Sequence, residues 1–179
     1  MKSPILETEH YLIRPFKESD AELWQKWDVD EAVQEHMPEP MNESQDIAGQ
    51  YAYIKECEAD EEGRYWSIET KTGETIGTVA LTDINEYHKI AEIGIVIGDK
   101  TWWGKGAATE VVRAIVDYAF DTLGLMRVSA EAEAGNIGIA KVLEGVGFTQ
   151  DGLFVSARVK KGVRINVKHY GIMNRQSTS

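Results

Sequence analysis

The chain has few cysteines, few prolines and no long apolar run. It contains one cysteine, Cys57, and four prolines among 179 residues. A single cysteine excludes an intramolecular disulfide framework and a cysteine-rich zinc site, and the four histidines have no metal-ligand spacing. No segment approaches the ~18 apolar residues of a membrane helix, and the start lacks an apolar signal region. We therefore expect a soluble cytoplasmic protein with one domain over residues 1–179, no metal and no membrane partner.

Basic side chains are also scarce. There are 19 lysines and arginines against 30 acidic residues, a net charge of −11, which argues against nucleic-acid binding. Residues 1–100 contain 23 acidic and 9 basic side chains, a net of −14, whereas residues 101–179 have a net charge of +3. Two interpretations are open. Either the acidic surface keeps the protein soluble, or residues 1–100 bind a cationic ligand while residues 101–179 bind an anionic one.

Local patterns predict strands and helices around one sheet. Apolar spacing and capping signals predict helices over residues 20–27, 44–61, 107–124 and 137–145. Alternation and turn signals predict strands over residues 11–14, 65–68, 75–83, 90–97, 127–132, 148–158 and 164–173. Residues 28–41 read as loop with a helical turn, and residues 174–179 as a loose tail.

A glycine-rich turn, Trp102 to Thr109, leaves a strand and opens a helix. The first N–H groups of a helix have no internal acceptor, and small residues let a ligand approach them, so the turn suits a phosphate or pyrophosphate. Lys105 adds positive charge. The spacing does not satisfy a P-loop, and Thr109 stands where a dinucleotide fingerprint needs glycine or alanine. A glycine turn without a ligand is the alternative.

Three spaced motifs resemble the GNAT acetyltransferase superfamily. They are Ala91 to Gly98, Trp103 to Glu110, and Asn136 to Phe148. The opening, from Leu6 to Ala21, is similar to the branch of ribosomal-protein N-terminal acetyltransferases, and the resemblance extends to Ile172. It implies a single α+β GNAT-type domain, with a mixed, mostly antiparallel sheet of six to seven strands flanked by about four helices. It also implies acetyl-CoA as the donor and an amine as the acceptor.

The resemblance further implies where acetyl-CoA binds. In this family the sheet splays after the strand at 90–97 and admits the pantetheine arm, whose backbone partners would lie on that strand. The family's phosphate loop corresponds to the glycine-rich turn, with Trp103 in place of Gln or Arg. Asn136 matches a family Asn near the pantetheine and also suits a helix N-cap. The implied binding residues are Ile95, Val96, Ile97, Trp103, Gly104, Lys105, Gly106, Ala107, Ala108 and Asn136.

Glu92 is the first candidate for the catalytic base, because an amine attacks a thioester only when uncharged. It resembles a family glutamate on the same strand, and alternation places it on the face of Gly94 and Val96. A solvent-facing strand glutamate is the alternative, and Glu131 is the reserve candidate. Tyr170 and a water molecule are the remaining candidates for the acid. The family's usual acid positions hold other residues here, namely Ile139, Leu143 and Asn166.

We therefore expect an acetyl-CoA-dependent N-acetyltransferase. The favoured acceptor is a protein or peptide N-terminus, such as a basic segment attracted by the acidic first part. A polyamine, an aminoglycoside or another small amine is the second possibility, a non-catalytic CoA-binding module the third, and a ligand-free scaffold the fourth. A monomer and a homodimer both fit the sequence.

Overall fold

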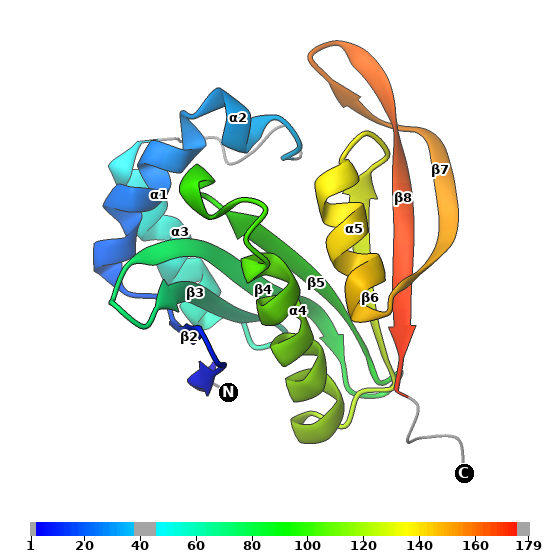
Figure 1. Ribbon diagram of the computed structural model, residues 1–179, viewed down its shortest axis with the longest axis horizontal. Helices are drawn as coiled ribbons and strands as arrows, with labels where there is room; N and C mark the ends of the chain where they lie inside the picture. Colours follow the sequence, from blue (N-terminus) through cyan, green and yellow to red (C-terminus); the bar gives the residue numbers. More distant parts are fainter. Residues whose placement is uncertain (1–2, 38–45, 175–179) are drawn as a thin grey trace.

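A computed structural model describes residues 3–37 and 46–174 (Figure 1). Within them, eight strands form one sheet in the order β1-β2-β3-β4-β5-β6-β8-β7. The strands are β1 (Leu6–Glu7), β2 (Tyr11–Pro15), β3 (Arg64–Thr70), β4 (Thr75–Asn85), β5 (Ile90–Ile97), β6 (Arg127–Glu133), β7 (Thr149–Lys160) and β8 (Val163–Met173). The α-helices are α1 (Ala21–Asp28), α2 (Glu31–Gln34), α3 (Ile47–Ala59), α4 (Ala107–Asp117) and α5 (Ile137–Val146).

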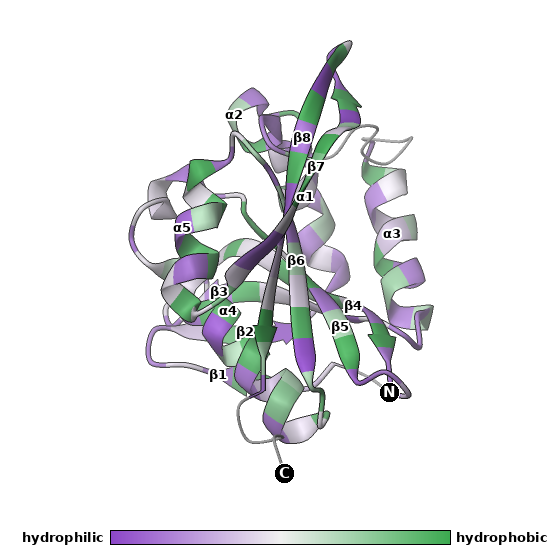
Figure 2. Ribbon diagram, turned by 90° about the vertical axis from the view of Figure 1, so that its right-hand side faces the viewer, coloured by the Kyte–Doolittle hydropathy of each residue, from purple (hydrophilic) through white to green (hydrophobic). Residues whose placement is uncertain are grey.

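Helices cover both faces of the sheet. Figure 2 shows α5 and α3 on opposite sides of it. The main core includes α4, whose Val111 and Ile115 are completely buried because apolar residues recur at helical spacing along one face. A π-helical segment, η3 (Tyr118–Thr122), continues α4. Along the described residues, no helix combines the length and the apolar character needed to cross a bilayer.

The α+β class is confirmed, but the element counts differ from those expected. The sheet has eight strands rather than six to seven, because the two-residue strand β1 carries no alternation that could reveal it. The fifth helix, α2, is the single turn expected within residues 28–41, and the Asp30 side chain caps it. Residues 38–41 of that expected loop lie outside the described residues. Residues 44 and 45 of the expected second helix lie outside the described residues, as do 175–179 of the expected tail. Asn174 is not loose, since its backbone N–H donates to Met126 O at 2.9 Å.

The sheet divides at β5 and β6. Strand β5 pairs antiparallel with β4 from Ile90 to Ile97, but it pairs with the parallel strand β6 only from Ile90 to Glu92. The last pair is Glu92 with Ser129, and Ser129 Oγ donates to Ala91 O at 3.2 Å. Beyond it the two strands separate, as Figure 1 shows. The splayed sheet expected from the resemblance is therefore confirmed.

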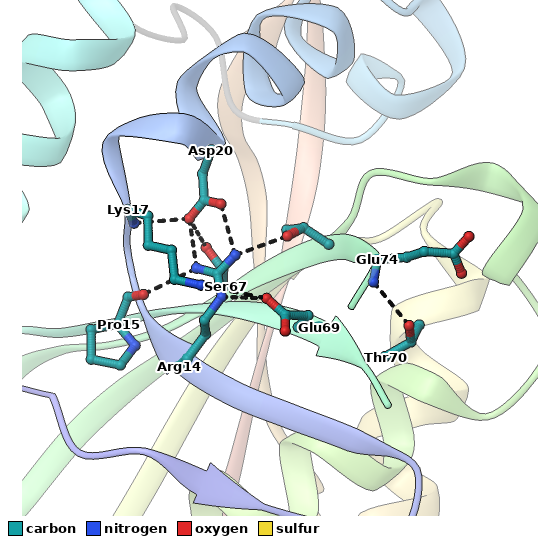
Figure 3. Close-up of polar contacts among 9 residues, drawn as sticks. Arg14, Pro15, Lys17, Asp20, Ser67, Glu69, Thr70 and Glu74 are labelled. Atoms are coloured by element: carbon teal, nitrogen blue, oxygen red, sulfur yellow. Dashed lines mark hydrogen bonds and ion pairs between the residues drawn. The ribbon is translucent and has the colours of Figure 1, made fainter. Parts of the chain in front are cut away.

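A buried ion pair joins β2 to the start of α1 (Figure 3). Arg14 donates through both terminal nitrogens to the Asp20 carboxylate, at 2.8 Å each, and through Nε to Glu69 at 2.6 Å. Asp20 also accepts from Ser67 Oγ at 2.7 Å. Burial alone would raise the pKa of Asp20, but the hydrogen bonds from Arg14 and Ser67 outweigh it and lower the pKa below its usual value. This network fixes the entry of α1, which forms a wall of the site described below.

Asp20→Ala is expected to lower the free energy of unfolding by about 3 kcal/mol or more, because it leaves a buried guanidinium with only Glu69 to balance it. Urea denaturation measures the change. Glu7→Ala is the control, since it removes an exposed carboxylate paired with Lys71 and should have little effect. Equal destabilisation by both variants would contradict the assigned role of the buried pair.

Candidate active site

A cleft of about 990 Å³ opens where β5 and β6 separate. Its floor comes from β5 and β6, one end from the turn before α4, and the opposite wall from α1, α2 and α3. The cleft therefore has two ends that differ in chemistry. One is rich in backbone N–H groups and small side chains, and the other is rich in carboxylates and aromatic rings.

The small-residue end is built by two glycines in left-handed conformation. Gly104 has φ +72° and Gly106 has φ +86°, which L side chains adopt only with strain. A Cβ added at either position would meet nothing within 4 Å, so the backbone is open to an approaching group. Gly106 caps α4 without any side-chain cap bond, and the N–H groups of the first turn begin at Ala107. The helix dipole adds partial positive charge there.

Two aromatic side chains complete this turn. Trp103 Nε1 donates to Ile97 O at 2.7 Å, which ties the turn to the end of β5. Lys105 Nζ lies 5.1 Å from the centre of the Trp102 ring. The cleft lining includes Trp102 and Trp103 but not Lys105, whose side chain is exposed. Lys105 would therefore contribute charge at the rim of the cleft rather than inside it.

The remaining expected cofactor residues also line the cleft. Ile95, Val96 and Ile97 lie on the part of β5 that has no β6 partner, so a strand-like group can be added along this stretch. Of these three residues, Ile97 already uses its carbonyl oxygen to accept from Trp103. Asn136 caps α5, with its side chain accepting from Ile139 N at 3.1 Å. The capping interpretation of Asn136 is therefore confirmed, and Asn136 lies at the cleft as well.

These features fit coenzyme A. A diphosphate needs N–H groups without internal acceptors and with no Cβ in the way. The first turn of α4 offers such N–H groups, and Gly104 and Gly106 leave the approach to them open. An amide-bearing pantetheine arm needs a free strand edge, which β5 offers beyond Glu92.

The acidic end of the cleft has three carboxylates on one face of the floor. Glu92 pairs in register with Ser129, and side chains alternate along β6, so Glu92, Glu131 and Glu133 face the same side. All three line the cleft. Glu131 and Glu133 are paired with cations, whereas no ion pair to Glu92 occurs among the described residues. Of the three carboxylates, Glu92 is thus the one whose charge a cationic ligand would balance.

The pKa of Glu92 is raised, first by burial and then by repulsion from Glu131 and Asp83, while His169 and Arg158 act in the opposite direction. Glu131 forms an ion pair with Arg158 and lies 3.2 Å from His169 Nε2. A half-buried carboxylate with a raised pKa accepts a proton at higher pH than an ordinary glutamate, as a general base requires. Glu131 is already engaged by Arg158 and His169.

Aromatic rings and further acidic groups form the opposite wall. Trp24, Trp27 and Tyr53 line the cleft, together with Asp28 at the end of α1. Asp28 accepts from Gln50 Nε2 at 2.5 Å, and burial raises its pKa. Sequence reasoning did not find Asp28 or Glu133. The one available signal was the Glu131–Glu133 alternation, which ran one residue beyond the expected end of the strand.

Tyr170, the candidate acid, lies elsewhere. It pairs with Ala130 in β8, is completely buried in the main core and does not line the cleft. Its hydroxyl has no hydrogen-bond partner within the described residues. Ile139 and Leu143, which occupy family acid positions, line the cleft with apolar side chains. Over the same residues, no group of three or more histidine, cysteine, aspartate or glutamate side chains could hold a metal ion.

Comparisons with known proteins agree with this geometry. The family model of the acetyltransferase (GNAT) domain matches residues 10–149. The uncharacterized N-acetyltransferase p20 of Bacillus licheniformis is 30% identical over 96% of this chain and 97% of its own length. The "Putative ribosomal N-acetyltransferase YdaF" of Bacillus subtilis is 31% identical over 58% of this chain and 56% of its own length.

A solved structure has the same fold. Spermidine N-acetyltransferase from Vibrio cholerae, in complex with CoA and spermine, superposes with a TM-score of 0.83 at 22% identity, covering 93% of this chain and 96% of that one. The family match spans most of the chain, and the turn before α4 and the free edge of β5 suit the cofactor that this family uses. The chain belongs to the GNAT family of acetyl-CoA-dependent N-acetyltransferases.

Proposed function

We infer that this N-acetyltransferase acts on a primary amine of a small linear acceptor that carries more than one positive charge. The observation that carries the inference is the row of three carboxylates, Glu92, Glu131 and Glu133, along the cleft floor. Such a row favours a flexible cation over an apolar or anionic acceptor. The spermidine N-acetyltransferase with the same fold supports this acceptor class.

The donor would occupy the other end of the cleft. In this assignment the N–H groups around Gly106 hold the diphosphate, and the backbone of Ile95, Val96 and Ile97 pairs with the pantetheine arm. Trp103, Gly104, Ala107 and Ala108 shape the turn, Lys105 adds charge at its rim, and Asn136 faces the arm from α5. Acetyl-CoA supplies an acetyl thioester, which an uncharged amine attacks.

Glu92 would take the proton from that amine, directly or through one water. A primary amine with a pKa near ~10.4 is almost entirely charged at pH 7, so it must lose a proton before it attacks. The raised pKa of Glu92 suits this task, and the negative charge of the cleft draws the amine in. Tyr170 receives no role in this assignment, because its side chain lies in the core.

A protein or peptide N-terminus stays the second candidate. It is favoured by the resemblance to the ribosomal-protein branch and by the relative YdaF. An α-amino group, with a pKa near ~8, is also easier to deprotonate. The aromatic wall formed by Trp24, Trp27 and Tyr53 favours the narrower, small acceptor instead.

Release of CoA thiol from acetyl-CoA tests the two candidates. The panel contains spermidine, 1,8-diaminooctane, an aminoglycoside and basic peptides with free N-termini. We expect the highest kcat/KM with the linear oligoamines. A preference for a peptide would favour the ribosomal-protein branch, and turnover of the aminoglycoside alone would contradict both acceptor assignments.

A further inference from the structure

A lysine from the β7–β8 hairpin reaches the far end of the carboxylate row. Lys160 is the last residue of β7, and its Nζ lies 2.8 Å from Glu133 Oε1 and 2.8 Å from Met37 O. The exposed fractions of the two side chains are only 10% for Lys160 and 9% for Glu133. An ammonium is therefore held between a carboxylate and a backbone carbonyl with little water around it.

The groups that hold this ammonium belong to the cleft, whereas the lysine comes from outside it. Glu133, Met37 and His36 line the cleft, and Lys160 does not. The second oxygen of Glu133 lies 3.3 Å from His36 Nδ1. Oxygen acceptors arranged around one ammonium would serve equally well for an alkylammonium ligand, because both cations offer the same donors and charge.

The spacing along β6 relates this position to the base. Glu92 pairs in register with Ser129, and Glu133 is four residues farther along β6. At the rise of a β-strand this is about 13 Å. An acceptor whose reactive amine lies at Glu92 would place a second ammonium near Glu133 only if a long chain, such as that of a triamine, separates the two nitrogens.

We propose that Lys160 is an internal competitor for the distal ammonium of the acceptor, and that it thereby sets selectivity among amines. The proposal rests on the oligoamine acceptor inferred above. In the free enzyme Lys160 neutralises Glu133, and an acceptor with a distant second charge must displace it. An acceptor with one amine does not reach Glu133 and does not meet this competition.

Removal of the Lys160 charge distinguishes competition with the ligand ammonium from a purely structural role of this lysine. In Lys160→Met the Glu133 carboxylate keeps the His36 ring as a neighbour but loses its ammonium partner, and a bound alkylammonium would replace that partner. Competition predicts tighter binding of diamines in this variant. If Lys160 only held the wall in place, the variant would bind every amine more weakly.

The experiment compares two ligands that differ only in the distal ammonium. Binding of 1,8-diaminooctane and n-octylamine to the CoA-loaded enzyme is measured by calorimetry, for wild type and Lys160→Met. We expect the Kd of the diamine to fall about tenfold and that of the monoamine to change less than twofold. An unchanged or raised Kd for the diamine would overturn the proposal.

Three further variants secure the result. Lys161→Met removes the same charge from the adjacent exposed position and should leave both Kd values unchanged. Glu133→Gln, added to Lys160→Met, should abolish the gain for the diamine. Lys160→Gln keeps a donor for Met37 O and replaces the methionine variant if the latter unfolds early in a thermal scan. Because binding is read without turnover, a failure to acetylate any amine would count against the proposed function separately.

Discussion

The Kd of CoA is expected to rise at least about 100-fold in Gly106→Glu. The new side chain would place a carboxylate beside the N–H groups that open α4, where the helix dipole otherwise favours a phosphate. Gly106 also has φ +86°, so any side chain there strains the turn that presents those groups. Calorimetric titration with CoA measures the loss.

Two controls separate charge from strain. Gly73→Glu introduces the same side chain at φ +90°, also with nothing within 4 Å of its Cβ, in the turn that joins β3 to β4. This variant should bind CoA as wild type does. Gly106→Ala adds strain without charge and should give an intermediate Kd. Wild-type affinity in Gly106→Glu would mean that the diphosphate binds elsewhere.

Glu92→Gln is expected to lower kcat about 100-fold to 1000-fold with the best acceptor, while CoA binding stays unchanged. The amide keeps the shape of the side chain but cannot take the proton. Because the pKa of Glu92 is raised in the folded protein, the acidic limb of the wild-type pH–rate profile should lie above the usual glutamate range. That limb should vanish in the variant. Steady-state thiol release over a pH series measures both effects.

The same substitution should not destabilise the fold. The folded pKa of Glu92 lies above its unfolded value, so the unfolded state loses its proton first as the pH rises. The free energy of unfolding of the wild type therefore decreases as the pH rises from the unfolded to the folded pKa of Glu92. The variant does not show this decrease, because glutamine does not titrate. At pH 7 the unfolding free energy of Glu92→Gln should equal or exceed that of wild type in urea denaturation.

Glu131→Gln is the matched comparison for the base. It removes a carboxylate from the same face of the cleft floor but breaks contacts with Arg158 and His169. We expect a smaller loss of kcat than in Glu92→Gln, together with lower stability. A larger loss of kcat in Glu131→Gln than in Glu92→Gln would reassign the base to Glu131.

Much of the fold and of the donor end could be predicted because their signals are local. The alternation of Ile90 to Ile97 matches β5 without error, since one face of that strand is buried. The two glycines of the turn were expected where a helix begins, and both have positive φ. The short strand β1 was missed, because two residues are too few to form a periodic pattern. The one-turn helix α2 lies where a helical turn was expected, within residues 28–41.

The acceptor end was less predictable because its contacts join distant parts of the chain. Tyr170 has the same alternation signal whether its ring faces the cleft or the core, and only the packing of β8 against β6 decided for the core. His36 belongs to the segment 28–41 that was expected to be mostly loop, yet it lies against Glu133, 97 residues away.

The amino-acid order alone determined which of the longer segments become strands and helices, where small residues expose a helix start, and which strand carries Glu92. Such properties depend on neighbours within a few positions. Tertiary structure alone decided that β5 and β6 stop pairing after Glu92 and Ser129, and that Lys160 meets Met37 across 123 positions of sequence. Long-range pairing and burial select these contacts, because many side chains must pack together before any one of them is favourable.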